Sequence, residues 1–195
     1  METADTTTIE TIFGDLPALE TSRLILRKVK LEDAPDMFAY ARDPEVSRFT
    51  VWSPHITMED TLRFLGCVIK GYEKGAVENW GIVHKEDNKF IGTCGYFSWE
   101  PEHFRGDIHY ALSPAYNGKG IMTEAVNAVL RFGFEQMGLN RIEANCMPEN
   151  IASERVMQKA GMRFEGIMRE RIFAKGRFHD VKVYAILLKD WREKR

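Results

Sequence analysis

The sequence LSPAYNGKGIMTEA, residues 112–125, decides the fold of this chain. Its first residues are predicted to end a strand, and Gly118 and Gly120 follow. Its last residues begin a long amphipathic pattern that predicts a helix. Two close glycines let the backbone approach a ligand without Cβ clashes. The N–H groups at the start of the following helix then form a site for phosphate or pyrophosphate. Taken alone, the motif also fits an ordinary glycine turn, and its spacing matches neither a Walker loop nor a dinucleotide fingerprint.

A second segment, ENIASERVMQKAG, covers residues 149–161. It places Asn150 at a strand-to-helix junction and Ser153 three residues later. Both residue types are favoured helix caps, so a purely structural role is the alternative on local grounds.

Hydrophobic periodicity extends the pattern in both directions. Helices are predicted over 31–42, from 57 onward, and over 120–137 and 153–160. Strands are predicted over 23–27, 79–84, 90–99, 107–112, 141–147, 164–173 and 178–188. Residues 1–20 are interpreted as a loose arm, residues 43–55 as a loop, and residues 21–195 as one domain. The order predicts an α+β domain around a single mixed, mostly antiparallel sheet.

Composition excludes several classes of protein. The chain has 195 residues and a net charge of -2, so it has no global basic field for nonspecific nucleic-acid binding. Its N-terminus lacks the features of a signal peptide, and no apolar run is long enough to span a membrane. The three cysteines are widely spaced, which argues against a disulfide framework or a zinc site. We therefore expect a cytoplasmic protein without a metal.

The combined pattern is much more specific than either part. Strand, Gly-x-Gly, long helix, strand, Asn-x-x-Ser, helix and Lys-x-Gly together resemble the GNAT acetyltransferases, within them the branch that acetylates N-terminal alanines of ribosomal proteins. The opening strand at residues 23–27, the segment 164–166, Asp180 and Tyr184 continue the match, which covers roughly residues 20–191. The resemblance implies a twisted sheet flanked by helices and splayed at two central strands, with acetyl-CoA as cofactor.

The resemblance also implies how the cofactor is held. The pantetheine arm would lie between the strands of residues 110–112 and 144–146, held by the main chain of Ala111 and Leu112 and by Asn150. Ala115 stands where the superfamily has Gln or Arg, but a site built from N–H groups does not need that side chain. The pyrophosphate would lie on the backbone amides of Asn117, Gly118, Lys119, Gly120 and Ile121.

The chemistry requires a proton donor for the thiolate and an acceptor for the proton of the amine. Many enzymes of the family place a Tyr acid seven residues after the Asn, where this chain has Met157; Ser153 is the available replacement. Asp107 and His109 alternate on one strand and are the candidate bases, with Glu100 as a third. Transfer of the proton through water is the alternative.

On the acceptor side, Trp52 and Tyr96 or Trp99 are expected to pack against the substrate, with plain core packing as the alternative. The predicted acceptor is the N-terminal amine of a protein, with a ribosomal protein as the candidate. A polyamine, amino sugar or antibiotic acceptor, and a CoA-binding module without turnover, are the competing hypotheses. We expect no direct contact with nucleic acid or membrane, and a monomer or homodimer.

Overall fold

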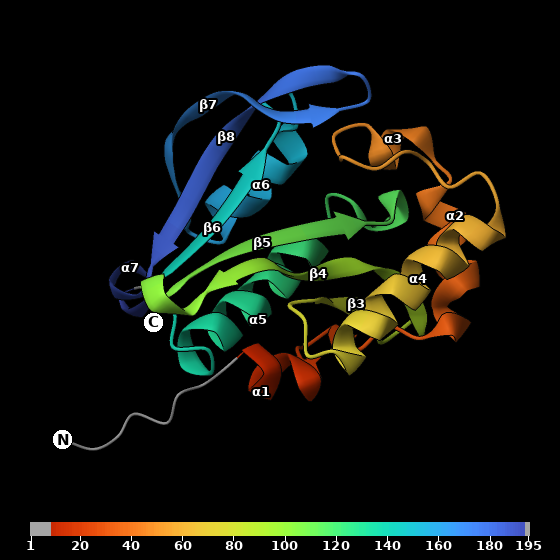
Figure 1. Ribbon diagram of the computed structural model, residues 1–195, viewed down its shortest axis with the longest axis horizontal. Coiled ribbons are helices and arrows are strands. Elements are labelled where there is room, and N and C mark those ends of the chain that lie inside the picture. The colour runs from red at the N-terminus through yellow and green to blue at the C-terminus, as the bar shows by residue number, and fades with distance from the viewer. Residues whose placement is uncertain (1–8, 194–195) are drawn as a thin grey trace.

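An eight-stranded sheet organises the part of the chain that the computed structural model describes, residues 9–193 (Figure 1). Its strand order is β1-β2-β3-β4-β5-β6-β8-β7, and every neighbouring pair is antiparallel except β5 with β6. The mixed, mostly antiparallel α+β fold predicted from the sequence is therefore confirmed. The strands are β1 (Leu19–Glu20), β2 (Leu24–Arg27), β3 (Asn79–His84), β4 (Lys89–Glu100), β5 (Arg105–Leu112), β6 (Arg141–Cys146), β7 (Arg163–Ala174) and β8 (Arg177–Leu187).

Helices cover both faces of the sheet. On one face the Tyr96 hydroxyl of β4 donates to the Val129 carbonyl of α5 at 3.1 Å. On the other face Phe90 of β4 stacks against Tyr40 of α2, with ring centroids 6.5 Å apart. The α-helices are α1 (Ile9–Gly14), α2 (Ala34–Ala41), α3 (Pro44–Ser47), α4 (Met58–Glu73), α5 (Ile121–Glu135), α6 (Ile151–Lys159) and α7 (Leu188–Arg192), with 3-10 turns η1 (Leu31–Asp33), η2 (Pro101–His103) and η3 (Pro114–Tyr116).

Local signals set the starts of two helices that the sequence analysis treated differently. At α4, where a helix was predicted from residue 57 onward, the Asp60 carboxylate accepts the N–H groups of Ile56 and Thr57, both at 3.0 Å, as in a capping box. At α3, inside the segment expected to be a loop, Asp43 caps the helix by accepting the Glu45 N–H at 2.9 Å. The Pro that follows Asp43 suits the first helical position, so this short helix had a readable signal.

The segment expected to be a loose arm is partly built into the domain. Residues 9–20 contain α1 and β1, and the ring of Phe13 is fully buried. The Trp80 indole N–H donates to the Pro17 carbonyl at 2.7 Å, which fixes this segment to β3. The rest of the expected arm, residues 1–8, lies outside the described residues. None of the helices described is long and apolar enough to cross a membrane.

Candidate active site

The strands β5 and β6 separate along their length, and we call the place where they part the cleft. The two strands pair only at their beginnings, where residues 105–107 of β5 lie opposite residues 141–143 of β6. From His109 to Leu112, β5 keeps its pairing with β4 but has none with β6. Backbone groups on that side of β5 lack a strand partner and are available to a ligand. The splay between two central strands, which the sequence analysis expected, is thus present (Figure 1).

The glycine loop, which we define as residues 117–121, lies beyond the open end of β5. Gly118 and Gly120 both have left-handed backbone conformations, with φ of 75° and 74°. A Cβ atom at Gly118 would meet nothing within 4 Å, so the conformation rather than space requires glycine there. The ammonium of Lys119 lies 5.4 Å from the centroid of the Tyr116 ring. The loop leads directly into α5, whose first N–H groups can bind an anion.

Arg23 fastens the glycine loop to the beginning of β2. Its guanidinium donates to the Lys119 carbonyl at 2.9 Å and to the Glu124 carboxylate at 2.7 Å. Glu124 also accepts hydrogen bonds from the hydroxyls of Thr21 and Ser22 and from the Arg23 N–H. Loss of solvation opposes ionisation of Glu124, but these four hydrogen bonds outweigh it and lower its pKa to about 2. No local pattern predicts this clamp, because Arg23 and Glu124 are 101 positions apart in the sequence.

Ser153 lies at the start of α6 and is connected to β5. The Asn150 side-chain oxygen accepts the Ser153 N–H at 3.1 Å, which makes Asn150 a helix cap. The Tyr110 hydroxyl lies 2.9 Å from the Ser153 Oγ and also donates to the Ser153 carbonyl at 3.2 Å. Burial raises the pKa of Tyr110, so its hydroxyl stays protonated. Met157, which has no proton to donate, is fully buried in the core.

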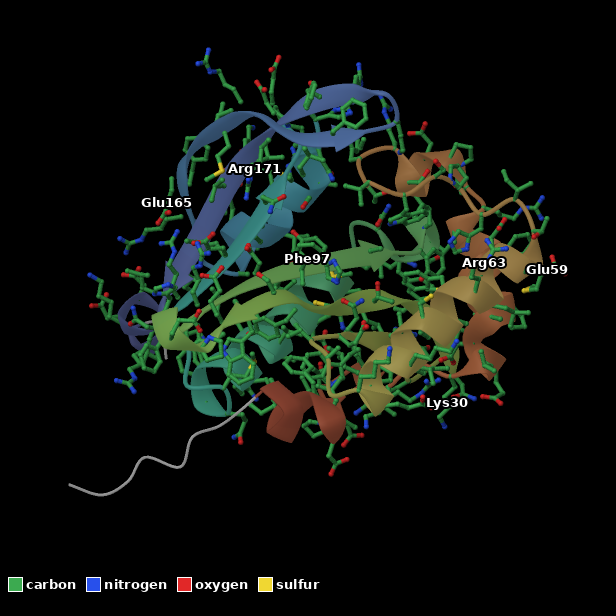
Figure 2. The ribbon with its side chains drawn as sticks, viewed as in Figure 1. Lys30, Glu59, Arg63, Phe97, Glu165 and Arg171 are labelled. Carbon is green, nitrogen blue, oxygen red and sulfur yellow. The ribbon has the colours of Figure 1, made fainter. Side chains whose placement is uncertain are left out.

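His109 and Asp107 lie on the face of β5 opposite to Tyr110. The His109 ring contacts Phe97 of β4, whose side chain is 72% exposed, at a centroid distance of 5.7 Å (Figure 2). Although its edge is accessible to solvent, loss of solvation lowers the pKa of His109 to about 4. Burial raises the pKa of Asp107, with the nearby charge of Glu143 acting in the same direction. Glu100, the third candidate base, is instead paired with Arg105.

Two residues expected at the acceptor site lie in the core. Tyr96 is 1% exposed, and its hydroxyl is bound to α5. Trp99 is 6% exposed and packs against Phe13 of α1, with ring centroids 6.1 Å apart. Both side chains therefore pack in the core, which is the alternative stated for them above. Phe97 is the aromatic residue of β4 that faces the site. Tyr96 lies opposite Ile108, on the face of β4 away from Gly95 and His109. A β-bulge between Tyr96 and Ser98 shifts the alternation so that Trp99 lies on that same face.

The β7–β8 hairpin and α3 bound the acceptor side of the site. In Figure 1 the hairpin arches over β5 toward α3. The Lys175 ammonium, near the tip of the hairpin, donates to the Ser47 carbonyl at the end of α3. Burial lowers the pKa of Lys175. Trp52, in the segment after α3, is half-buried against His55, so it remains a candidate for acceptor contact.

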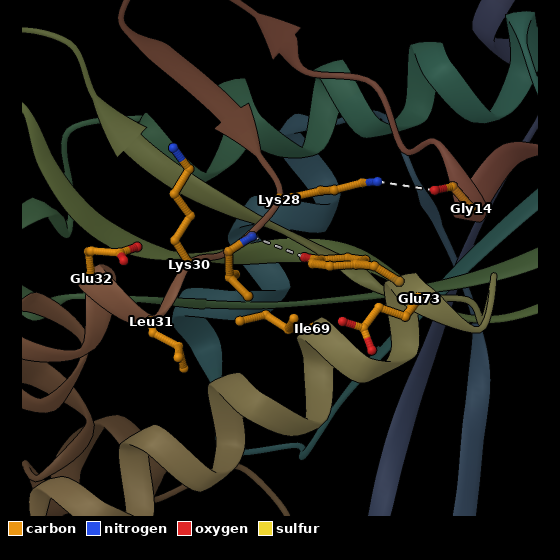
Figure 3. Close-up of a pocket in the computed structure, with 9 residues that line it drawn as sticks. Gly14, Lys28, Lys30, Leu31, Glu32, Ile69 and Glu73 are labelled. Atoms are coloured by element: carbon orange, nitrogen blue, oxygen red, sulfur yellow. Dashed lines mark hydrogen bonds between the residues drawn. The ribbon is translucent and has the colours of Figure 1, made fainter.

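Two hollows lie outside the cleft. One, of about 700 Å³, adjoins the glycine loop along α5 and is lined by Gly120, Thr123, Asn127, Arg131 and Lys159 among others. The other, of about 480 Å³, lies between the end of α1, the segment after β2 and α4 (Figure 3). There Lys28 donates to the Gly14 carbonyl at 3.1 Å. This second hollow shares no lining residue with β5, β6 or the glycine loop, so it is separate from the site. Within the described residues there is also no group of three His, Cys, Asp or Glu side chains able to hold a metal ion.

Comparison with known proteins identifies the class of protein. Residues 23–163 match the model of the acetyltransferase (GNAT) domain, and the chain belongs to this family. It is 34% identical over 176 residues to the uncharacterized N-acetyltransferase p20 of Bacillus licheniformis, covering 90% of this chain and 99% of the relative. GNAT proteins are acyltransferases that use acetyl-CoA, and proteins of this fold are known with coenzyme A or acetyl-CoA bound. The family, the enzyme class and the cofactor predicted from the sequence are confirmed.

Two further relatives relate the chain to particular proteins. A GNAT acetyltransferase of Bacillus anthracis has a similar structure, with a TM-score of 0.79, 32% identity, and coverage of 89% of this chain and 99% of that one. The [ribosomal protein uS5]-alanine N-acetyltransferase of Escherichia coli is 25% identical over 183 residues, covering 89% of this chain and 92% of the relative. The chain is therefore a GNAT N-acetyltransferase whose relatives include an alanine N-acetyltransferase of a ribosomal protein.

Proposed function

We propose that this GNAT enzyme transfers an acetyl group from acetyl-CoA to the N-terminal amine of a protein, with ribosomal proteins as the leading class of acceptor. The observation that carries the proposal is the splay between β5 and β6, because the open end of β5 carries His109 and leads to the glycine loop. The similarity to the uS5-alanine enzyme supports a protein N-terminus as acceptor.

The residues of the cleft fit acetyl-CoA. Backbone amides of the glycine loop and the start of α5 suit its pyrophosphate, and Lys119 adds a positive charge nearby. The unpaired backbone of Ala111 and Leu112 suits the pantetheine arm and the thioester oxygen, while Asn150 lies across the cleft at the start of α6. The hollow beside α5, with Arg131 and Lys159, suits the nucleotide end. Bound acetyl-CoA supplies an activated acetyl thioester.

His109 and Asp107 handle the proton of the amine. A base is most effective when its pKa lies near the working pH. With a pKa of about 4, His109 is uncharged at neutral pH but is a weak final acceptor. We assign it the hydrogen bond that orients the amine or an intervening water molecule. Asp107, two residues away on the same face, or water in the open cleft then takes the proton.

Ser153 and Tyr110 serve the leaving thiolate. Their hydroxyls are 2.9 Å apart, and Asn150 fixes the backbone of Ser153. A pair of hydrogen-bonded hydroxyls stabilises a developing negative charge better than an isolated serine, because each bond polarises the next. This pair compensates for Met157, which has no proton to donate.

Phe97, Trp52 and the β7–β8 hairpin are the proposed acceptor contacts. The hairpin carries Arg169, Arg171 and Arg177, which form no salt bridge among residues 9–193 (Figure 2 labels Arg171). This positive charge opposes a strongly basic tail and favours an acceptor whose first residues are neutral or acidic.

The test is thiol release from acetyl-CoA in the presence of a panel of amines. The panel contains peptides with N-terminal Ala or Ser followed by acidic, neutral or basic residues, together with spermidine and an amino sugar. Release with the N-terminal peptides, and mass-spectrometric detection of an acetyl group on their α-amine, is the expected result. Turnover with the small amines alone would contradict the proposal and indicate a small-molecule acetyltransferase. Tight CoA binding without turnover on any amine would indicate a binding module.

A further inference from the structure

A row of three residues crosses the floor of the site from β3 to β5. Asn79 of β3 lies opposite Gly95 of β4, and Gly95 lies opposite His109 of β5. Adjacent strands are about 4.8 Å apart, so Asn79 and His109 stand two strand spacings from one another. Their side chains nevertheless meet, because the Asn79 Oδ1 is in hydrogen-bond contact with the His109 Nε2 above Gly95.

Gly95 makes this contact possible by leaving space. A Cβ atom built at Gly95 would lie 2.6 Å from the Asn79 Cα and 3.2 Å from the Asn79 Oδ1. The backbone of Gly95 is not in the left-handed region, so conformational freedom is not the reason for glycine here. The missing side chain instead lets the Asn79 amide reach across β4.

The chemistry of the contact fixes the position of a proton. An amide oxygen only accepts hydrogen bonds, so the Nε2 that faces it carries the proton of the uncharged ring. The Nδ1 then keeps its lone pair. Asn79 is only 7% exposed, and its carbonyl accepts a hydrogen bond from the Tyr72 hydroxyl, which holds its backbone in place.

Few charges act on His109. The Phe97 ring packs against one side of it from β4 while another edge stays exposed, and Asp107 is the only acid on β5. Glu78 precedes Asn79 on the chain; burial raises its pKa to about 7, and it lies against Gly71 of α4. Loss of solvation is the cause that lowers the pKa of His109, so the ring is uncharged when it meets the amide.

We propose that Asn79 is a positioning residue that holds His109 in the Nε2–H tautomer, so that the Nδ1 lone pair is available to the acceptor amine or its bridging water. The inference rests on the proposed function, since it assigns Asn79 a role through His109. It also explains why a small residue is needed at position 95, between two polar partners.

The first experiment reads the tautomer directly and needs no turnover. Long-range ¹⁵N–¹H NMR of the full chain, with His109→Gln to assign the signals, distinguishes Nε2–H from Nδ1–H. We expect Nε2–H in the wild type and a mixture of tautomers in Asn79→Ala. Asn140→Ala, an exposed position remote in sequence from the site, is the matched control and should leave the spectrum unchanged. An Nδ1–H ring in the wild type, or an unchanged tautomer in Asn79→Ala, would overturn the inference.

The second experiment uses a nearly isosteric variant that keeps the fold. Asn79→Asp places a carboxylate beside the ring and should raise the pKa of His109 by about 1 unit or more, measured by NMR titration. Asn79→Ala should lower kcat about tenfold or more while the KM for acetyl-CoA stays within twofold. An unshifted titration in Asn79→Asp, or full kcat in Asn79→Ala, contradicts the role of Asn79. If the wild type shows the expected tautomer but His109→Gln keeps full kcat, the role proposed for His109 is wrong, and the role proposed for Asn79 is wrong with it.

Discussion

Replacing Glu124 with Gln removes the charge at the centre of the clamp on the glycine loop. The pKa of Glu124 is lowered from 4.5 to about 2 in the folded protein. At 1.36 kcal/mol per pKa unit, this shift corresponds to at most about 3 kcal/mol of stability. Glu124 and Arg23 have side chains that are 17% and 43% exposed, so solvent screens part of the interaction. We expect Glu124→Gln to lose about 1–2 kcal/mol at pH 7.

The pH dependence gives this prediction a definite sign. Because the pKa of Glu124 is lower in the folded state, its stabilisation is complete above about pH 4.5 and is lost as the pH falls through about 2. The difference in unfolding free energy between wild type and Glu124→Gln should therefore shrink toward zero across that window. Urea unfolding at a series of pH values measures it. Glu86→Gln is the control, since Glu86 is exposed and forms no salt bridge within residues 9–193.

The same variant should weaken coenzyme A binding. The Arg23 guanidinium has two partners here, the Glu124 carboxylate and the Lys119 carbonyl. Without the charge of Glu124, the guanidinium is held less firmly against the Lys119 carbonyl. We expect the dissociation constant for coenzyme A to rise several-fold by isothermal titration calorimetry. Equal stability of the two proteins at pH 7, or a difference that persists unchanged at pH 2.5, would refute the reasoning.

Three other substitutions probe the remaining parts of the site. Gly118→Val forces a β-branched residue into a left-handed conformation and should raise the dissociation constant for coenzyme A at least tenfold by calorimetry; unchanged affinity would count against the glycine loop. Ser153→Ala and Tyr110→Phe should each lower kcat about tenfold with little change in the KM for acetyl-CoA. Because the two hydroxyls act together, the kcat of the double variant should be little lower than that of either single variant. Additive losses in steady-state kinetics would show separate roles. Phe97→Ala should raise the KM for the peptide alone, and an equal rise for acetyl-CoA would place Phe97 elsewhere.

The parts of the site that the sequence predicted are those with local signals. A positive-φ turn needs glycine, so Gly118 and Gly120 identify the loop that precedes α5. Asn150 and Ser153 are three residues apart at a helix start, and the structure joins them by one hydrogen bond. Such features depend on a few neighbouring residues, which a single sequence contains in full.

The parts that the sequence did not predict depend on register or on distant partners. One bulge residue in β4 places Trp99 on the same face of the sheet as Tyr96, away from His109. Asn79 and His109 are 30 positions apart and meet only because Gly95 lies between them. Arg23 and Glu124 are separated by 101 positions. No periodicity encodes these encounters, because they result from how strands align in the folded sheet.

The contact between Lys175 and the Ser47 carbonyl has a topological consequence. The β7–β8 hairpin is joined to the sheet through β6 at its base and to α3 at its tip, so this one hydrogen bond closes a hoop of polypeptide. A chain can be threaded through a hoop only by one of its ends. An internal lysine, which lies in the middle of a chain, would have to wait for the hoop to open. Under the proposed function, the hoop would favour a terminal amine by its connectivity, independently of the side chains that line it.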